Sequence, residues 1–264
     1  MQLNTDKMIA EKDSGIGWVI YNNPARHNAM SMEMQLAIPQ ILDAFEVDDE
    51  VRVVVIRGAG EKAFISGADI SEFETKRSGE EATKLYNEAG GRAIASFAKL
   101  DKPLIAMIQG FCMGGGLATA LQADLRIASE ESQFAIPAAR LGIGYGYAGV
   151  RDLVTLVGPA YASEILFSAR RFSAEEALRI GLVNRVVEKR DLEQTVRELA
   201  RSIAENAPLS VKAAKAAIHQ AVVDRENRDL ELIDRLVRAC FESQDYIEGR
   251  RSFMEKRRPR FKGI

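Results

Sequence analysis

The sequence predicts an α/β protein of the α+β type, with a β-rich front part and a helical C-terminal part. Apolar, β-branched runs that are typical of strands recur through the front of the chain and alternate with helical segments. Strand–strand–helix units therefore recur, although without a repeat of fixed period. From Asp191 onward the pattern is almost wholly helical. We predict a core over residues 1–190 and a helical region over residues 191–264.

The composition narrows the possible classes of function. With 264 residues and a net charge of -2, the chain can bury a sizeable core and has no excess of basic charge for binding nucleic acid. It contains no apolar run of membrane-spanning length and no signal-peptide pattern, so we expect a cytoplasmic protein. Two cysteines, Cys112 and Cys240, make no disulfide or metal pattern, and only two histidines are present.

The first residues predict a strand, a turn and a helix. Residues 16–21 are apolar and β-branched, and the turn residues Asn-Asn-Pro follow them. Ser31 can cap a helix with one apolar face, and Pro39 is expected to kink or shorten it. Residues 51–56 are typical of a buried parallel strand.

The middle of the chain predicts further strands around one polar segment. Residues 71–88 look mobile, with Gly79 and the pair Gly90-Gly91 acting as breakers before a helix over 92–100. Residues 63–70 form a short apolar run that Ser-Gly breaks, and further strands are expected over residues 104–108, 125–128 and 133–136.

The end of the chain predicts helices in succession. Ser173-Ala174-Glu175-Glu176 is a capping box that starts a short helix ending at Gly181. Four longer helices are expected over residues 191–205, 209–223, 230–243 and 248–256. Long amphipathic helices in this position either form oligomer contacts or pack on the core, and core packing is the commoner case.

A glycine-rich stretch between a strand and a helix is the candidate functional element. The apolar run 104–108 leads into Gly110, and Gly114-Gly115-Gly116 precede a small-residue helix that runs to Asp124. Free N–H groups at a helix start favour negative charge, and glycines let a ligand approach the backbone. The stretch is therefore either an anion or oxyanion cradle, or a tight turn that needs small residues.

Three other motifs favour simpler interpretations. Gly144–Gly149 has the spacing G-x-G-x-x-G, but no strand-like run precedes it, so a loop is favoured over a dinucleotide site. Cys112 could be a nucleophile, yet no histidine lies nearby in sequence, and burial is favoured. The basic segment 256–260 is either a solvated end or a phosphate contact.

Four motifs in register resemble the crotonase, or enoyl-CoA hydratase/isomerase, superfamily. They are Ala-Phe-Ile-Ser-Gly-Ala-Asp at 63–69, Gln-Gly-Phe-Cys-Met-Gly-Gly-Gly at 109–116, Ser-Ala-Glu-Glu-Ala-Leu-Arg-Ile-Gly-Leu-Val-Asn at 173–184, and the ending 248–259. The resemblance covers essentially the whole chain. It implies a spiral of ββα turns, a helical trimerisation region, and a homotrimer or a hexamer built from two trimers. It also implies an acyl-CoA substrate that carries its own coenzyme A, with no separate cofactor, no metal and no membrane or nucleic-acid partner.

The resemblance assigns roles to individual residues. The backbone N–H groups of Ala68 and Gly115 match the pair that holds the thioester oxygen as it becomes an enolate oxyanion. The coenzyme A contacts that it implies are Arg26, Ser66, Ala68, Asp69, Ile70, Gly115, Phe253 and Lys256. Residues 66–70 would line the adenine end. Phe253 and Lys256 would close over coenzyme A from the same or a neighbouring subunit.

The sequence departs from the family at both positions that carry glutamates in hydratases. These positions hold Ala118 and Ala138, which can neither give nor take a proton. Positioned acid–base groups contribute about 10²–10⁴-fold to rate, so hydration by the two-glutamate route is disfavoured. Decarboxylation of a malonyl-type thioester needs an oxyanion hole but no strong base.

Residues 141–145 are similar to the segment of methylmalonyl-CoA decarboxylase that places a tyrosine by the substrate carboxylate, here Tyr145. Decarboxylase relatives carry a histidine where this chain has Ala68, so the substrate contacts differ. A decarboxylase-type lyase reaction is the preferred hypothesis. The alternatives are a hydratase or isomerase that uses an unusual group such as Tyr145, and a catalytically silent acyl-CoA-binding subunit. Other polar residues that are candidates for a role in the reaction are Asp69, Glu72, Arg140, Tyr147 and Asp152.

Overall fold

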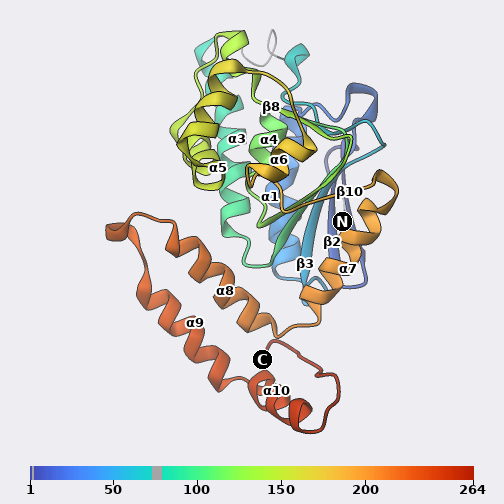
Figure 1. The fold of residues 1–264 in the computed structure, drawn as a ribbon, viewed down its shortest axis with the longest axis vertical. Helices are drawn as coiled ribbons and strands as arrows, with labels where there is room; N and C mark the ends of the chain where they lie inside the picture. Colours follow the sequence, from blue (N-terminus) through green and yellow to red (C-terminus); the bar gives the residue numbers. More distant parts are fainter. Residues whose placement is uncertain (2, 73–78) are drawn as a thin grey trace.

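Two β-sheets form the front part of the protein, and helices surround them (Figure 1). The computed structural model describes residues 1, 3–72 and 79–264. The larger sheet has the strand order β1-β2-β3-β5-β7-β10. Its strands are β1 Met8–Asp13, β2 Ile16–Tyr21, β3 Val53–Gly58, β5 Leu104–Ile108, β7 Leu125–Ser129 and β10 Arg185–Val187. β1 and β2 form an antiparallel hairpin, and the other neighbours are parallel.

The smaller sheet shows how the chain winds. Its order is β4-β6-β8-β9, with β4 Ala63–Ile65, β6 Phe111–Met113, β8 Gln133–Ala135 and β9 Phe172–Ser173. Each of β3, β5 and β7 in the large sheet is followed by a strand of the small sheet and then by a helix. The chain thus makes successive ββα turns, which confirms the predicted strand–strand–helix units and the mixed α/β class.

Apolar side chains fill both faces of the large sheet. The main core cluster lies between the two sheets and the helices α1, α3, α4 and α5. On the opposite face, Trp18, Val55 and Ile105 pack against Leu192 and Val196 of α7, which spans Leu192–Ala204. α7 therefore covers the large sheet, while the helices after it extend away from it (Figure 1). The division at residue 190 stays a prediction.

Two helices differ from expectation. α1, Met32–Glu46, is capped by Ser31 as predicted, but Pro39 lies inside it and does not shorten it. α3, Glu80–Lys99, starts before the predicted helix and runs through Gly90-Gly91, so these two glycines were wrongly assigned as breakers, whereas Gly79 is the N-cap of α3 as that assignment expects. A buried stripe that includes Tyr86, Ala93 and Phe97 explains this, since its packing offsets the roughly 1 kcal/mol cost of each glycine. The rest of the predicted mobile segment, residues 73–78, lies outside the described residues.

The remaining helices of the core are α4 Gly115–Ala120, α5 Tyr147–Ser168 and α6 Ala174–Arg179. α5 is interrupted at Gly158, where φ is 75° and Pro159 follows. Ser173 caps α6 by accepting a hydrogen bond from the Glu176 N–H at 3.2 Å, which confirms the predicted N-cap, while the Glu176 carboxylate accepts from Arg170 at 2.9 Å. Short 3₁₀ helices join these elements, namely η1 Pro24–Arg26, η2 Ile70–Glu72, η3 Pro137–Leu141, η4 Lys189–Asp191 and η5 Arg225–Asn227.

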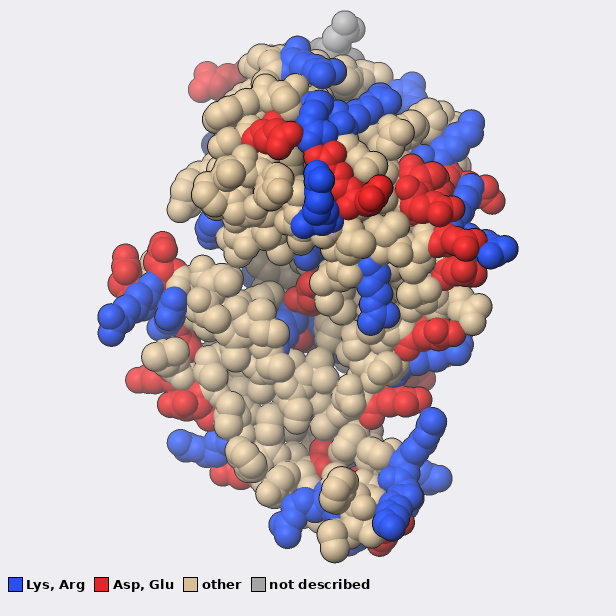
Figure 2. Space-filling view, viewed as in Figure 1, with Lys and Arg blue, Asp and Glu red and all other residues tan. Residues whose placement is uncertain are grey.

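Three helices, α8 Pro208–Ala221, α9 Leu230–Glu242 and α10 Gln244–Met254, form an extension from the core (Figure 1). The Lys215 ammonium anchors α8, because it lies 2.8 Å from the Asp124 carboxylate and 2.9 Å from the Lys102 carbonyl. No residue of α9 is buried, although its apolar side chains gather on one face. Figure 2 shows the extension covered by uncharged side chains, with charged residues at its edges. Every helix in residues 1, 3–72 and 79–264 is too short or too polar to cross a lipid bilayer.

Candidate active site

The glycines at 114–116 each meet a different physical demand. Gly114 has φ 51° and ψ -114°, a conformation that side chains disfavour, and its N–H donates to the Ala135 carbonyl at 2.8 Å. At Gly116 a Cβ would lie 2.1 Å from the Ile65 carbonyl oxygen, so the start of α4 can approach β4 only with glycine here. The tight-turn interpretation is therefore confirmed for these two residues.

Gly115 lies close to a second backbone amide, that of Ala68. It is the first residue of α4, and a Cβ built on it would lie 3.7 Å from the Ala68 nitrogen. Ala68 and Gly115 are both only partly buried. Neither N–H donates a hydrogen bond to another described residue. The structure thus brings together the two amides that the sequence predicts as a pair, and leaves both without a partner in the described chain.

A short backbone bridge fixes the orientation of Ala68. The Met30 N–H donates to the Gly67 carbonyl at 2.8 Å, and the Asp69 N–H donates to the Met30 carbonyl at 2.9 Å. Because both bonds are made by the neighbours of Ala68, the N–H of Ala68 itself is left out of the bridge. The Met30 methyl group also lies 3.2 Å from the Cβ position of Gly115. The loop that carries Met30 therefore defines one wall of the site.

Asn28 holds that loop in place, and the sequence interpretation missed it. This fully buried residue has a positive φ of 55°. Its amide nitrogen donates to the carbonyls of Ala59 and Ala63 at 2.9 and 2.8 Å, and its side-chain oxygen accepts from the Asn23 N–H at 2.9 Å. An asparagine after a turn is a common surface pattern, so only the fold identifies its three partners.

Arg26, Ser66 and Asp69, predicted to contact coenzyme A, lie together on the Ala68 side of the site. The Arg26 guanidinium lies 3.1 Å from the Asp69 carboxylate and also donates to the Ser71 hydroxyl. The Ser66 hydroxyl donates to the Arg26 carbonyl at 3.4 Å. Burial alone would raise the pKa of Asp69, but hydrogen bonds from Ser71 and the charge of Arg26 hold it below its ordinary value. Asp69 is therefore an ionised anchor for Arg26.

The positions after the glycines present methyl groups only. Ala118 lies one turn into α4 and Ala138 lies in η3, and both are partly buried. The Gln122 side chain connects α4 to Asp152. Its amide nitrogen donates to the Ala118 carbonyl at 3.4 Å and to the Asp152 carboxylate at 3.1 Å. Neither alanine can transfer a proton, so any acid or base must come from elsewhere.

Tyr145 lies in the connection before α5, one residue ahead of its N-cap Gly146. A Cβ on Gly149 would lie 2.7 Å from the Tyr145 ring, so the last glycine of G-x-G-x-x-G admits this ring. The preceding element is the 3₁₀ helix η3 and not a strand, which confirms the loop interpretation of the motif. The Tyr145 hydroxyl is buried without a hydrogen-bond partner in the described chain. Burial and the nearby Asp152 charge raise the pKa of Tyr145 to about 12.

Comparison with known proteins identifies the family. The enoyl-CoA hydratase/isomerase family model matches residues 11–264. The chain belongs to the enoyl-CoA hydratase/isomerase family. It is 36% identical to the short-chain-enoyl-CoA hydratase of Clostridium acetobutylicum, over 98% of this chain and 97% of that protein. It is 34% identical to the crotonyl-CoA hydratase of Syntrophomonas wolfei, over 97% and 98% of the two chains.

Solved structures of hydratase/isomerase proteins share the fold. An enoyl-CoA hydratase/carnithine racemase from Magnetospirillum magneticum superposes with a TM-score of 0.93 at 34% identity, covering 99% of this chain and 97% of that one. The enoyl-CoA hydratase of Bacillus anthracis gives a TM-score of 0.91 at 31% identity, covering 98% and 100%. The chain is thus a hydratase/isomerase-family acyl-CoA enzyme with the crotonase fold.

The other predicted site residues of this hydratase/isomerase-family chain are dispersed. Ile70 is exposed on η2 beside Asp69. Phe253, 82% exposed, lies on α10, which is far from α4 (Figure 1), and Lys256 follows it. Within one chain the structure does not bring these two residues to the paired amides.

Burial settles one alternative that the sequence left open. Cys112 is fully buried, and its burial raises the pKa of the thiol, so the buried interpretation is confirmed over the nucleophile. Arg257 of the basic segment pairs with Glu248 at 2.6 Å. No group of three or more His, Cys, Asp or Glu side chains in the described part of the chain is arranged to hold a metal ion.

Replacing Asn28 with alanine is expected to destabilise the fold by about 2–4 kcal/mol, because buried polar groups left unpaired each cost about 1–3 kcal/mol. Asn22→Ala is the matched control, since Asn22 makes a single exposed side-chain hydrogen bond, to the Asp6 carbonyl. Urea unfolding of the two variants measures the difference. Equal unfolding free energies would show that Asn28 does not hold this loop.

Proposed function

We propose that this protein binds an acyl-CoA with the thioester oxygen between the N–H groups of Ala68 and Gly115, and stabilises the enolate that forms. The observation that carries the proposal is the convergence of two partly exposed amides that donate to no described residue. Fixed donors aimed at developing negative charge are the strongest single contribution in many active sites, at about 3–4 kcal/mol for a donor removed by mutation. Family membership supports the same assignment.

The reaction we propose is the decarboxylation of a malonyl-type thioester. The bond between the α-carbon and the carboxylate breaks, carbon dioxide leaves, and the electron pair moves into the thioester enolate. Its oxygen accepts hydrogen bonds from Ala68 and Gly115, and a proton then adds to the α-carbon. No base is needed to form this enolate, which fits a site with alanine at positions 118 and 138.

Tyr145 is the candidate for delivering that proton or for orienting the carboxylate. Its hydroxyl is buried and unpaired in the described chain, and its raised pKa of about 12 keeps it protonated at neutral pH. Asp152, which Gln122 and Arg151 hold by hydrogen bonds, is the nearby charge that resists loss of the proton.

Hydration or isomerisation is the second candidate, because the relatives are named as hydratases. In this chain it would require a group other than Ala118 and Ala138 to move the proton, and Tyr145 is the candidate for that group. A silent acyl-CoA-binding subunit is the alternative from another class. Ala118 and Ala138 also fit a silent subunit, because such a protein needs no group that transfers a proton.

Coenzyme A recognition and assembly complete the proposal. We propose that Arg26, Ser66, Asp69 and Ile70 contact the coenzyme A moiety. Because α10 lies away from the paired amides, Phe253 and Lys256 would reach a bound coenzyme A only from a neighbouring subunit. The exposed apolar face of α9, which includes Leu230, Val237 and Phe241, supports a homotrimer or a dimer of trimers in a cytoplasmic enzyme.

An assay with two thioesters tests the proposal. Purified protein is incubated with methylmalonyl-CoA and with crotonyl-CoA, and carbon dioxide release and loss of enoyl absorbance are followed. We expect carbon dioxide release from the first and little hydration of the second. Hydration at about 10 s⁻¹ or faster would favour the second candidate, and tight coenzyme A binding without turnover would favour the silent subunit.

Tyr145→Phe separates the role of the hydroxyl from that of the ring. We expect turnover to fall by about 10²-fold or more if the hydroxyl transfers the proton, while coenzyme A affinity stays unchanged. Because the raised pKa keeps Tyr145 protonated, the wild-type rate is not lost through its ionisation between neutral pH and about pH 10. Tyr147→Phe is the control, because Tyr147 is an exposed tyrosine two residues further on, at the start of α5. Equal rates in all three proteins would remove Tyr145 from the mechanism.

A further inference from the structure

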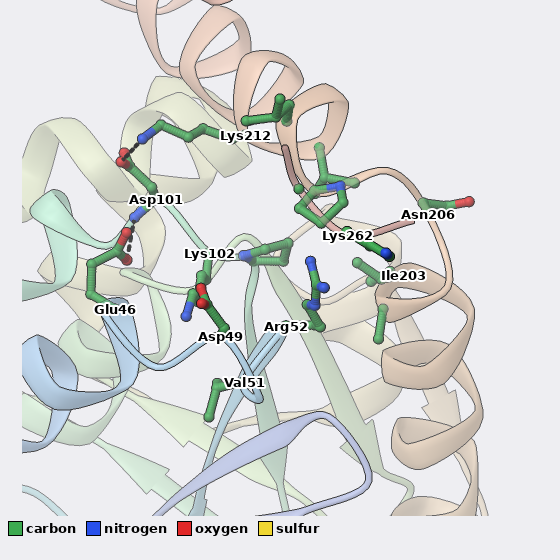
Figure 3. Close-up of a pocket in the computed structure, with 16 residues that line it drawn as sticks. Glu46, Asp49, Val51, Arg52, Asp101, Lys102, Ile203, Asn206, Lys212 and Lys262 are labelled. Carbon is green, nitrogen blue, oxygen red and sulfur yellow. Dashed lines mark hydrogen bonds and ion pairs between the residues drawn. The ribbon is translucent and has the colours of Figure 1, made fainter. Parts of the chain in front are cut away.

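A cavity of about 140 Å³ lies at the joint between the core and the helical extension (Figure 3). Four separate segments meet there, namely the turn before β3, the turn before β5, the connection from α7 to α8, and the residues after α10. None of its lining residues belongs to the candidate active site. We call it the joint cavity and define it by Arg52, Lys102, Pro103, Leu209, Lys262 and Gly263.

Some of the charged side chains around the joint cavity have partners in the described chain and others do not. Lys212 forms an ion pair with Asp101 at 2.6 Å. Glu46 and Asp49 lie close enough to Lys102 to act on its charge, and the Lys102 ammonium also donates to the carbonyls of Phe45 and Asp48. These contacts account for the three carboxylates and for two of the four cations that line the joint cavity.

Arg52 and Lys262 are the two cations left over. Neither forms an ion pair or a side-chain hydrogen bond with a described residue. Figure 3 shows the Arg52 guanidinium directed into the space beside Lys262. One guanidinium nitrogen lies 3.5 Å from the Cβ position of Gly263, so the two cations come from chain segments that touch.

The position of Lys262 is fixed by its backbone. Asp245 is buried, and its carboxylate accepts hydrogen bonds from the Lys262 and Gly263 N–H groups at 2.7 Å each. The Ile264 carbonyl accepts from the Gln244 N–H at 2.7 Å. This backbone of the joint cavity is therefore ordered by the start of α10, and bringing Lys262 to face Arg52 costs little further chain entropy.

We propose that the joint cavity binds a small dianion, a phosphate or a dicarboxylate, between Arg52 and Lys262. Both cations line one cavity and neither forms an ion pair with a described residue, so an oxyanion between them would replace their mutual repulsion with attraction to both. The volume equals about four to five water molecules at ~30 Å³ each, which accommodates a phosphate. Arg52 belongs to the core and Lys262 to the extension. A bound anion would therefore contact both parts of the protein.

The test compares anions at equal ionic strength. Thermal unfolding is followed in sodium chloride, inorganic phosphate and succinate, and phosphate binding is measured by calorimetric titration. We expect saturable stabilisation of the wild type by phosphate, by succinate or by both, and an affinity at least tenfold weaker in Arg52→Gln and in Lys262→Gln. Which anion stabilises distinguishes a phosphate ligand from a carboxylate ligand.

Arg92→Gln is the matched control, because Arg92 is an exposed arginine on α3 outside the joint cavity. It is expected to keep the wild-type response. If Arg52→Gln does not fold, Lys262→Gln alone decides the question. Stabilisation by phosphate and succinate no greater than by chloride, or an unchanged affinity in Lys262→Gln, would overturn the proposal. The outcome is independent of the proposed reaction, since no active-site residue is altered.

Discussion

Replacing Gly115 with proline is expected to lower the turnover number by about 10²–10³-fold, the usual effect of removing one oxyanion-hole donor. Gly115 is the first residue of α4, where proline is well tolerated because its φ suits a helix start and the missing N–H has no helical partner. The substitution therefore deletes the donor and puts a ring carbon in place of its hydrogen. Initial rates with the thioester that the wild type converts measure the effect.

Gly115→Ala is the matched control for this experiment. It keeps the N–H but adds the same Cβ, which meets the Met30 methyl group at 3.2 Å, the far end of a flexible side chain. We expect the alanine variant to stay close to the wild type. If alanine and proline lower the turnover number equally, the effect comes from crowding by the side chain and not from the amide.

Restoring glutamate at positions 118 and 138 is expected to create hydratase activity. The wild type should hydrate crotonyl-CoA slowly, and the double variant Ala118→Glu/Ala138→Glu should hydrate it about 10²–10⁴-fold faster, the range of positioned acid–base groups. Both alanines are partly buried, Ala118 lies on α4 with Gly115, and both occupy the positions that the resemblance assigns to the hydratase glutamates. Loss of enoyl absorbance measures the rate.

The double variant Ala118→Gln/Ala138→Gln separates chemistry from size, because glutamine fills the same volume without an acid. It should remain as slow as the wild type. Rapid hydration by the wild type itself would show that another group already moves the proton, and it would replace decarboxylation with hydration as the proposed reaction.

The order of strands and helices could largely be predicted, because buried parallel strands leave strong apolar runs. Residues 51–56 and 104–108 became the greater part of β3 and all of β5. The amide pair was also predicted, but from the family resemblance of residues 63–69 and 109–116. Glycines alone left a turn and an anion cradle equally open, and the structure shows that Gly114 and Gly116 serve the turn.

Features that depend on distant partners could not be predicted. Gly90-Gly91 signals a break locally, yet α3 continues because its buried face packs on α1. Asn28 has an ordinary loop sequence, and its partners at Ala59 and Ala63 are set by the fold. Arg52 and Lys262 likewise line one cavity although they come from segments that no local pattern connects.

The carbonyl stretching frequency of a bound thioester tests directly whether the amides of Ala68 and Gly115 hold the thioester oxygen. Propionyl-CoA with ¹³C at its carbonyl, the expected product of methylmalonyl-CoA, is bound to the wild type, Gly115→Ala and Gly115→Pro, and isotope-edited infrared difference spectra are recorded. Hydrogen bonds from Ala68 and Gly115 weaken the carbonyl bond. We therefore predict that the carbonyl frequency in the wild type and in Gly115→Ala is lower than that of the free thioester. In Gly115→Pro a smaller shift is predicted. An unshifted wild-type band, or equal bands in the wild type and Gly115→Pro, would contradict the claim that these two amides hold the thioester oxygen.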